Sequence, residues 1–157
     1  NFLFCTAGPG GYDRYFVGLD RLRRRPEQVD SRVDPWHIYF NRHASGGRLL
    51  LVGDAEPFDL EVPALYNTCF DDCLLEDLVK GRTPQEVAAA LAQRGITYVF
   101  VDWGEIARYR SPGNYGFTDF VQPEVFRRLV EAGVLEPLPE IEGHPGRGYR
   151  VRKRGHH

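Results

Sequence analysis

The sequence predicts a small three-layer α/β domain with a Rossmann-like, mostly parallel sheet and a C-terminal antiparallel hairpin. Two short apolar runs, residues 48–54 and 96–102, carry this prediction, because turn residues bound each run and each ends in Asp. A helical segment separates the two runs. Apolar runs alternating with helices are typical of parallel strands buried on both faces. Ligands of open α/β sheets bind beyond the carboxyl ends of the strands, so the two aspartates mark the expected site.

The composition fits a single α/β domain over residues 1–155. The chain has 157 residues, and 42% of them are hydrophobic, which suits one packed core and excludes wholesale disorder. The net charge of −2 gives no indication of a nucleic-acid partner. We expect a fragment of a longer protein, because the chain begins at Asn1 and contains no Met. The pair His156 and His157 resembles a purification-tag remnant.

The first part of the chain predicts a loop or short strand over residues 1–12 and a helix capped by Asp13. The glycines of the loop are not a phosphate-binding motif, since neither Lys-Ser/Thr nor G-x-G-x-x-G follows. A basic cluster at residues 21–25 closes the helix. It suits either a charged last turn in water or contact with lipid headgroups or a phosphate.

Start and stop signals place the remaining elements. The clearest is Thr83-Pro84-Gln85-Glu86, a capping box with Pro at the first helical position. The polar and aromatic residues 103–118 predict a long loop. The other expected elements are a helix over 34–43, a strand within 62–70, a short helix from the Asp71-Asp72 cap to Val79, a helix over 123–133, and a hairpin of 136–142 with 148–153.

The first candidate site follows the first strand at Gly53, Asp54 and Glu56. In folds that bind nucleotides or methyl donors this turn is glycine-rich, so that the ligand approaches the backbone. One glycine and two acidic residues suit a dinucleotide poorly and the cationic S-adenosylmethionine better. The alternative is structural: Gly53 permits a tight turn and Asp54 caps the segment after it.

The second candidate site follows the next strand at Asp102, Trp103, Glu105 and Arg108. We expect it beside the first turn, in one crevice. Aromatic rings and planar charged groups together suit a sugar, a base or a peptide edge. The structural alternative is that Asp102 caps a helical turn on which Glu105 and Arg108 form an i, i+3 ion pair.

The cysteines favour no metal. Cys5, Cys69 and Cys73 are an odd number, and the last two are four residues apart without a C-x-x-C motif. They suit partly buried thiols, or a disulfide in an oxidising compartment. A zinc site needs further ligands, for which only His37 and His43 are available. We expect neither a metal nor a cofactor.

Several phrases together resemble a known family. They are Leu50-Leu51-Val52-Gly53-Asp54-Ala55, Val62 to Thr68 with Phe70-Asp71, and Gly95 to Trp103 with Glu105-Ile106 and Arg108-Tyr109. This pattern resembles the soluble region that follows the transmembrane helices of bacterial membrane glycosyltransferase-like proteins of the dolichyl-phosphate-mannose mannosyltransferase type. The likeness covers roughly residues 16–138.

The resemblance implies an accessory domain without activity of its own. The parent enzyme would transfer a sugar from a polyprenyl-phosphate donor, with its catalytic carboxylate in loops between membrane helices, so no catalytic residue is transferred to this chain. The expected partners are the transmembrane part of the parent chain and a sugar or lipid-linked acceptor, with the extracytoplasmic side favoured. The alternative function is a small-ligand-binding or S-adenosylmethionine-dependent enzyme that uses the crevice.

Overall fold

The computed structural model describes residues 33–152, within which the chain from Trp36 onward forms one compact unit. The predicted N-terminal loop, the helix after Asp13 and the basic cluster at residues 21–25 lie outside the described residues. The single domain over residues 1–155 therefore stays a prediction. None of the helices within residues 33–152 has the length and apolar character needed to cross a bilayer.

Five strands form one mixed sheet in the order β2-β1-β3-β5-β4. The central strand β1 is parallel to β2 and to β3, whereas β5 is antiparallel to β3 and to β4. The predicted parallel pairing of the two apolar runs and the C-terminal hairpin are confirmed. The predicted mostly parallel sheet is matched only in part, because half of the strand pairs are antiparallel. The strands are β1 (Arg48–Val52), β2 (Ala64–Leu65), β3 (Ile96–Val101), β4 (Leu135–Pro137) and β5 (Arg147–Val151).

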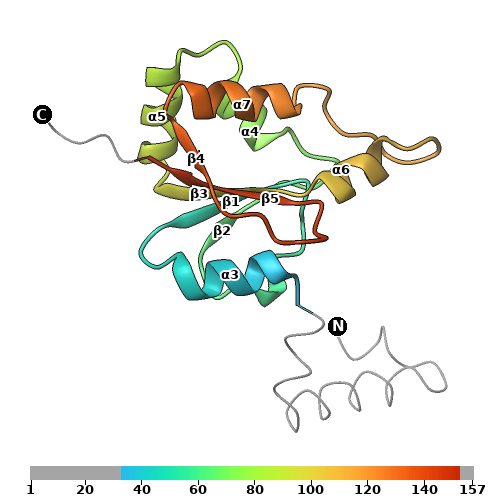
Figure 1. Cartoon of the computed structure of the whole chain (residues 1–157). Helices are drawn as coiled ribbons and strands as arrows, with labels where there is room; N and C mark the ends of the chain where they lie inside the picture. The colour runs from blue at the N-terminus through green and yellow to red at the C-terminus, as the bar shows by residue number, and fades with distance from the viewer. Residues whose placement is uncertain (1–32, 153–157) are drawn as a thin grey trace, which may run out of the picture. The chain divides into compact units, whose positions relative to one another are not determined.

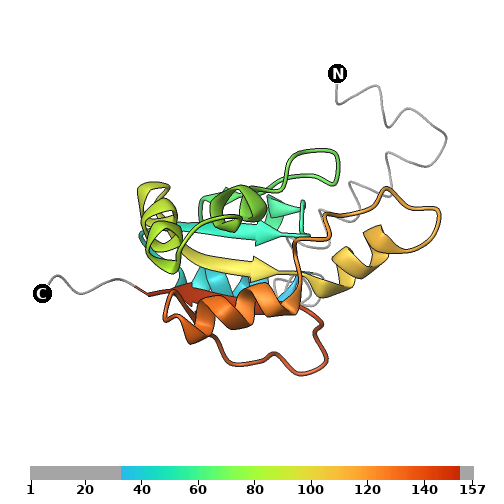
Figure 2. The same ribbon diagram turned by 90° about the horizontal axis from the view of Figure 1, so that it is seen from above.

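Helices cover both faces of this sheet. Figure 1 shows α3 on one face and α4, α5 and α7 on the other, and Figure 2 shows α6 beyond the ends of the parallel strands. The fold is therefore a mixed α/β arrangement. The helices of the described residues are α3 (Pro35–His43), the short 3-10 helix η1 (Pro57–Asp59), α4 (Leu74–Val79), α5 (Pro84–Gln93), α6 (Trp103–Arg110) and α7 (Pro123–Glu131).

The two central strands are buried on both faces, as their apolar runs predict. In β1, Leu49 and Leu51 join the core under α3, while Leu50 and Val52 join the core under the other helices. Phe100 of β3 is fully buried in the α3 core, 5.8 Å from the ring of Trp36. Because successive side chains of a strand point to opposite faces, a continuous apolar run is what two covered faces require.

The largest difference from the sequence prediction is α6, since residues 103–110 form a helix where a loop is expected. Only Ile106 of this helix is buried, so the segment lacks the apolar stripe by which helices are recognised. The cap is nevertheless present, because Asp102 accepts a hydrogen bond from the Glu105 amide at 3.0 Å. The structural alternative for Asp102 is thereby confirmed.

Near the second strand one prediction is confirmed and one is wrong. The strand β2 lies within the predicted range 62–70, but it has only two residues, because the chain turns at Asn67 and Thr68 into hydrogen-bonded loop structure. The predicted cap from Asp71-Asp72 is absent, since Cys73 is the N-cap residue of α4 and makes no side-chain cap. The Asp71 carboxylate instead accepts hydrogen bonds from the hydroxyl and the amide of Thr68.

Two helix ends form as predicted. Thr83 accepts from the Glu86 amide, and Glu86 accepts from the Thr83 amide at 2.8 Å, which completes the capping box of α5. At the end of α7, Gly133 has a φ of +71° and donates to the Val130 carbonyl, and Val134 donates to the Leu129 carbonyl, both at 2.9 Å. These bonds form a Schellman motif and satisfy carbonyls that the helix leaves without partners.

Replacing Thr83 with Ala should lower the free energy of unfolding by about 1 kcal/mol, because the α5 amide then loses its cap. Thr83→Ser keeps a hydroxyl acceptor and should remain within about 0.5 kcal/mol of the parent. Urea denaturation of both variants measures the difference. Equal destabilisation by Ala and Ser would contradict a capping role.

Candidate functional site

The carboxyl ends of β1 and β3 are adjacent, and the chain leaves these two strands toward opposite faces of the sheet. The chain that follows β1 packs Leu60 and Val62 against the core under α3. The chain that follows β3 places Trp103, Ile106 and Phe120 against the core under α4, α5 and α7. In open α/β sheets such a reversal between adjacent strands is where ligands bind. We call this end of the parallel strands the carboxyl edge.

Gly53 brings the end of β1 against the start of α6. Its φ is +84°, a left-handed conformation that glycine adopts without strain. A Cβ placed on it would lie 2.6 Å from Cγ1 of Ile106 and 2.9 Å from the carbonyl oxygen of Asp102. The space beside Gly53 is therefore filled by the protein itself, which explains the glycine without a ligand.

Asp54 turns away from α6 toward α3. Its side chain is nearly buried, and Oδ2 accepts from Nε2 of His37 at 2.7 Å. The other oxygen, Oδ1, accepts from the Glu56 amide at 2.8 Å. His37 is itself 3% exposed, so this hydrogen bond joins polar groups of two elements inside the protein. The Glu56 side chain remains exposed at the surface.

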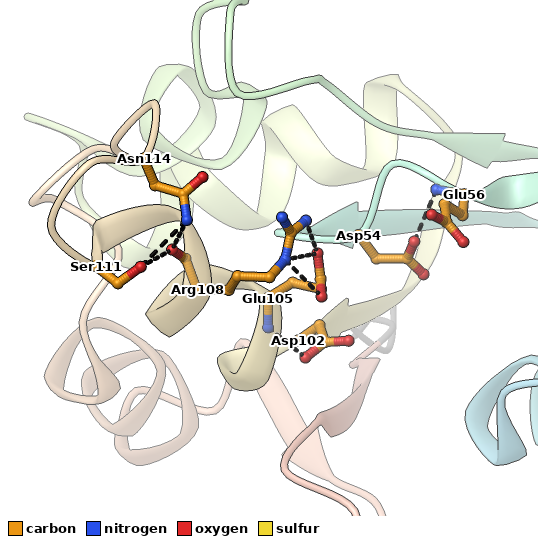
Figure 3. A network of polar contacts seen from close by, with 7 residues as sticks. All are labelled: Asp54, Glu56, Asp102, Glu105, Arg108, Ser111 and Asn114. Carbon is orange, nitrogen blue, oxygen red and sulfur yellow. Dashed lines mark hydrogen bonds and ion pairs between the residues drawn. The ribbon is translucent and has the colours of Figure 1, made fainter.

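The second candidate group lies along α6 (Figure 3). Asp102 caps the helix through Oδ1, and Glu105 forms an i, i+3 ion pair with Arg108, whose Nε lies 3.0 Å from Oε2. This hydrogen bond raises the pKa of the Arg108 guanidinium above its usual value. The guanidinium carbon also lies 4.6 Å from the ring centre of Tyr109.

Not all of the predicted site residues meet. Figure 3 shows Asp54 and Asp102 at neighbouring strand ends, with Glu105 and Arg108 farther along α6. Trp103 leaves this group, because its ring packs edge-on against Phe126 of α7 at 5.5 Å. The predicted crevice therefore contains fewer exposed side chains than the sequence predicts.

The described residues hold no metal constellation. Among residues 33–152 no three His, Cys, Asp or Glu side chains are grouped so as to hold an ion. Cys69 and Cys73 are both free thiols, and Cys73 is buried at the start of α4. His37, one of the two histidines considered for zinc, is bound to Asp54.

Sequence reasoning missed an exposed aromatic pair at the carboxyl edge. Phe70 and Tyr115 are 75% and 71% exposed, and their rings meet edge-to-face at 4.9 Å. Phe70 follows β2 and Tyr115 follows α6, so the pair joins two loops. Two further exposed aromatics, Phe58 and Tyr66, also lie on segments that follow β1 and β2. The signal available in the sequence was an aromatic residue in each of these segments between predicted elements.

Hydrogen-bonded turns hold both rings of this pair. Phe70 lies within the Thr68–Asp71 turn, and the hydrogen bonds from Thr68 lower the pKa of the Asp71 carboxyl below its usual value. Tyr115 follows a turn in which Asn114 Nδ2 donates to the Arg108 carbonyl at 2.8 Å (Figure 3). The two aromatic side chains are therefore presented on ordered backbone.

Comparison with known proteins adds no relative. No protein-family model matches the chain, and neither curated proteins nor solved structures gave a significant match. The functional argument therefore depends on the sequence and on this geometry.

Removing the Asp54 carboxylate by Asp54→Ala should lower the free energy of unfolding by about 1–3 kcal/mol, because the buried His37 ring loses its acceptor. Glu56→Ala is the matched control and should change stability by less than about 0.5 kcal/mol. A double-mutant cycle with His37→Phe, measured by urea denaturation, isolates the pair. A coupling energy near zero would refute the interaction.

Cys73 should react more slowly than Cys69 with iodoacetamide in the folded protein at pH 8. Burial raises the pKa of the Cys73 thiol, so less reactive thiolate is present at a given pH, and the side chain is 8% exposed. Peptide mass spectrometry against time measures each cysteine separately. In denaturant the two rates should converge, and a native rate at Cys73 equal to that at Cys69 would contradict its burial.

Proposed function

We propose that this chain is a non-catalytic accessory domain of a membrane glycosyltransferase-like protein, and that its carboxyl edge binds a sugar-bearing acceptor. One observation carries the proposal: Phe70 and Tyr115 form an exposed aromatic pair on two ordered loops of that edge. Single exposed apolar residues need no explanation, whereas adjacent exposed rings from distant loops indicate a contact surface.

The neighbouring groups suit a carbohydrate. An aromatic ring offers a flat apolar face to the C–H groups of a sugar, while planar polar side chains bind its hydroxyls. Arg108, Glu105 and Asn114 supply such polar groups next to the loop that bears Tyr115. The charges of Arg108 and Glu105 balance each other, so the surface favours an uncharged ligand over a strongly charged one.

The carboxylates at this edge support a binding role over a catalytic one. Asp54 accepts from His37 and from a backbone amide, Asp102 caps α6, and Glu105 binds Arg108. A general acid or base must reach a substrate proton with its own oxygen. Each of these three carboxylates already holds a structural partner, which suits an accessory domain.

The finer description of the fold belongs to the same proposal. The order β2-β1-β3 and the reversal at β1 are consistent with a small Rossmann-like unit, to which the antiparallel β5 and β4 are added. The membrane parent, its transmembrane part as partner and the extracytoplasmic side come from the resemblance in sequence. An S-adenosylmethionine-dependent enzyme is the rival, and the filled space beside Gly53 argues against it.

Phe70→Ala and Tyr115→Ala should each weaken sugar binding by roughly tenfold, because either change removes one ring of the platform. Binding is measured by thermal shift and calorimetry with a panel of neutral mono- and oligosaccharides. Phe58→Ala is the matched control, an exposed aromatic for which no ring contact is found among the described residues, and it should leave affinity within about twofold.

The same thermal-shift panel includes S-adenosylmethionine, nucleotides and sugar nucleotides. A true ligand at 100 times its dissociation constant adds about 2.7 kcal/mol of stability. Stabilisation by S-adenosylmethionine or a nucleotide alone would overturn the accessory-domain proposal in favour of the enzyme. Absence of a response to every sugar, or equal loss in Phe58→Ala, would also overturn it.

A further inference from the structure

A concave surface lies away from the candidate site, between the α4–α5 turn and α7. We call it the basic groove. It has a volume of about 410 Å³ and shares no residue with the carboxyl-edge site. Three cationic residues line it, Lys80, Arg82 and Arg128. Its lining includes no acidic residue of the described chain.

The cations of the basic groove are not equivalent. Lys80 forms an i, i+4 ion pair with Glu76 at 2.7 Å, so most of its charge is balanced. Arg82 and Arg128 make no ion pair with any carboxylate in the part of the chain that the structure describes. The nearest acid in sequence to Arg82 is Glu86, whose carboxylate is held in the capping box of α5, and the charge of Arg82 contributes to lowering the pKa of this carboxyl. Within residues 33–152 neither guanidinium group forms a direct ion pair, so both can contact an anion.

The remainder of the groove is apolar and firmly placed. Val87 and Val125 are 1% and 4% exposed and belong to the main core, and the partly buried Phe120 packs on the same core. The capping box orders the first turn of α5 on one side, and Val125 and Arg128 come from α7 on the other. A groove of several hundred Å³ with a few convergent polar groups is within the size range of small-molecule sites.

We propose that the basic groove binds a small amphiphilic anion: a phosphate or carboxylate on a short aliphatic or aromatic body. Arg82 and Arg128 would hold the anionic group, since guanidinium presents a planar fork that matches both carboxylate and phosphate. Phe120, which is only partly buried, would contact the apolar body above the buried Val87 and Val125. The size of the groove fits such a molecule, whereas a folded protein partner would need a larger surface. This site is independent of sugar binding at the carboxyl edge.

Hexyl phosphate is the probe, and inorganic phosphate and 1-hexanol are its two halves. A two-dimensional NMR titration of the full chain should show saturable amide shifts around Val87, Phe120 and Arg128 with hexyl phosphate. Each half should bind at least roughly tenfold more weakly, because it lacks either the charge or the apolar contact. Equal binding of either half, or shifts elsewhere, would overturn the proposal.

Matched variants test the role of the guanidinium groups. Arg82→Gln with Arg128→Gln should weaken hexyl phosphate binding roughly tenfold or more. Arg127→Gln is the control, since Arg127 is the neighbouring cation but faces Glu124 and Glu131, and it should change affinity by less than about twofold. An equal loss of affinity in the double variant and in Arg127→Gln would overturn the proposal.

Anionic vesicles provide the remaining arm of the experiment. Vesicles of phosphatidylglycerol are sedimented with the parent chain and with the Arg82→Gln, Arg128→Gln variant. Binding to vesicles without any response to monomeric hexyl phosphate would overturn the small-ligand site and indicate a lipid surface instead. Sugar binding at the carboxyl edge should be unchanged in these variants, so failure of one proposal is distinguishable from failure of the other.

Discussion

The parallel pairing of β1 with β3 is the constraint on which the rest of the structure depends. Leu50 lies opposite Val99, and the pairing continues past the strands, where the Asp102 amide donates to the Val52 carbonyl at 2.9 Å. Both strands are covered on both faces, so helices are required on each side. The same pairing brings Gly53 against α6 and so determines what the carboxyl edge contains.

Much of this arrangement is predictable because it depends on local patterns. Continuous apolar runs predict strands buried on two faces, and the capping box and Gly133 predict helix ends, each through a short-range physical rule. The structural roles of Gly53 and Asp102 are also predictable as alternatives, since a left-handed glycine and an aspartate cap need only neighbouring residues. How much of the sheet is antiparallel is harder to predict, because the short strands at its edge show little periodicity.

The remainder depends on contacts between distant residues. Asp54 is bound by His37, which lies one helix earlier, and nothing near Asp54 in sequence indicates this. The α6 segment buries only Ile106, so its sequence shows no apolar helical pattern. Trp103 packs against Phe126 of α7, a residue distant in the sequence. The Phe70–Tyr115 contact joins residues far apart in the chain. Such pairs are set by the topology and not by local spacing.

The tight contact between Gly53 and Ile106 has a consequence for how this scaffold can change. Enlarging the gap between the two strand ends would require α6 to shift, and α6 is tied through its cap and through the backbone of β1. Sequence variation in such a domain should therefore accumulate in the segments after β2 and α6, where insertions leave the sheet undisturbed. Loop exchange, with the strand ends preserved, is therefore the natural way to build a chosen binding surface on this fold.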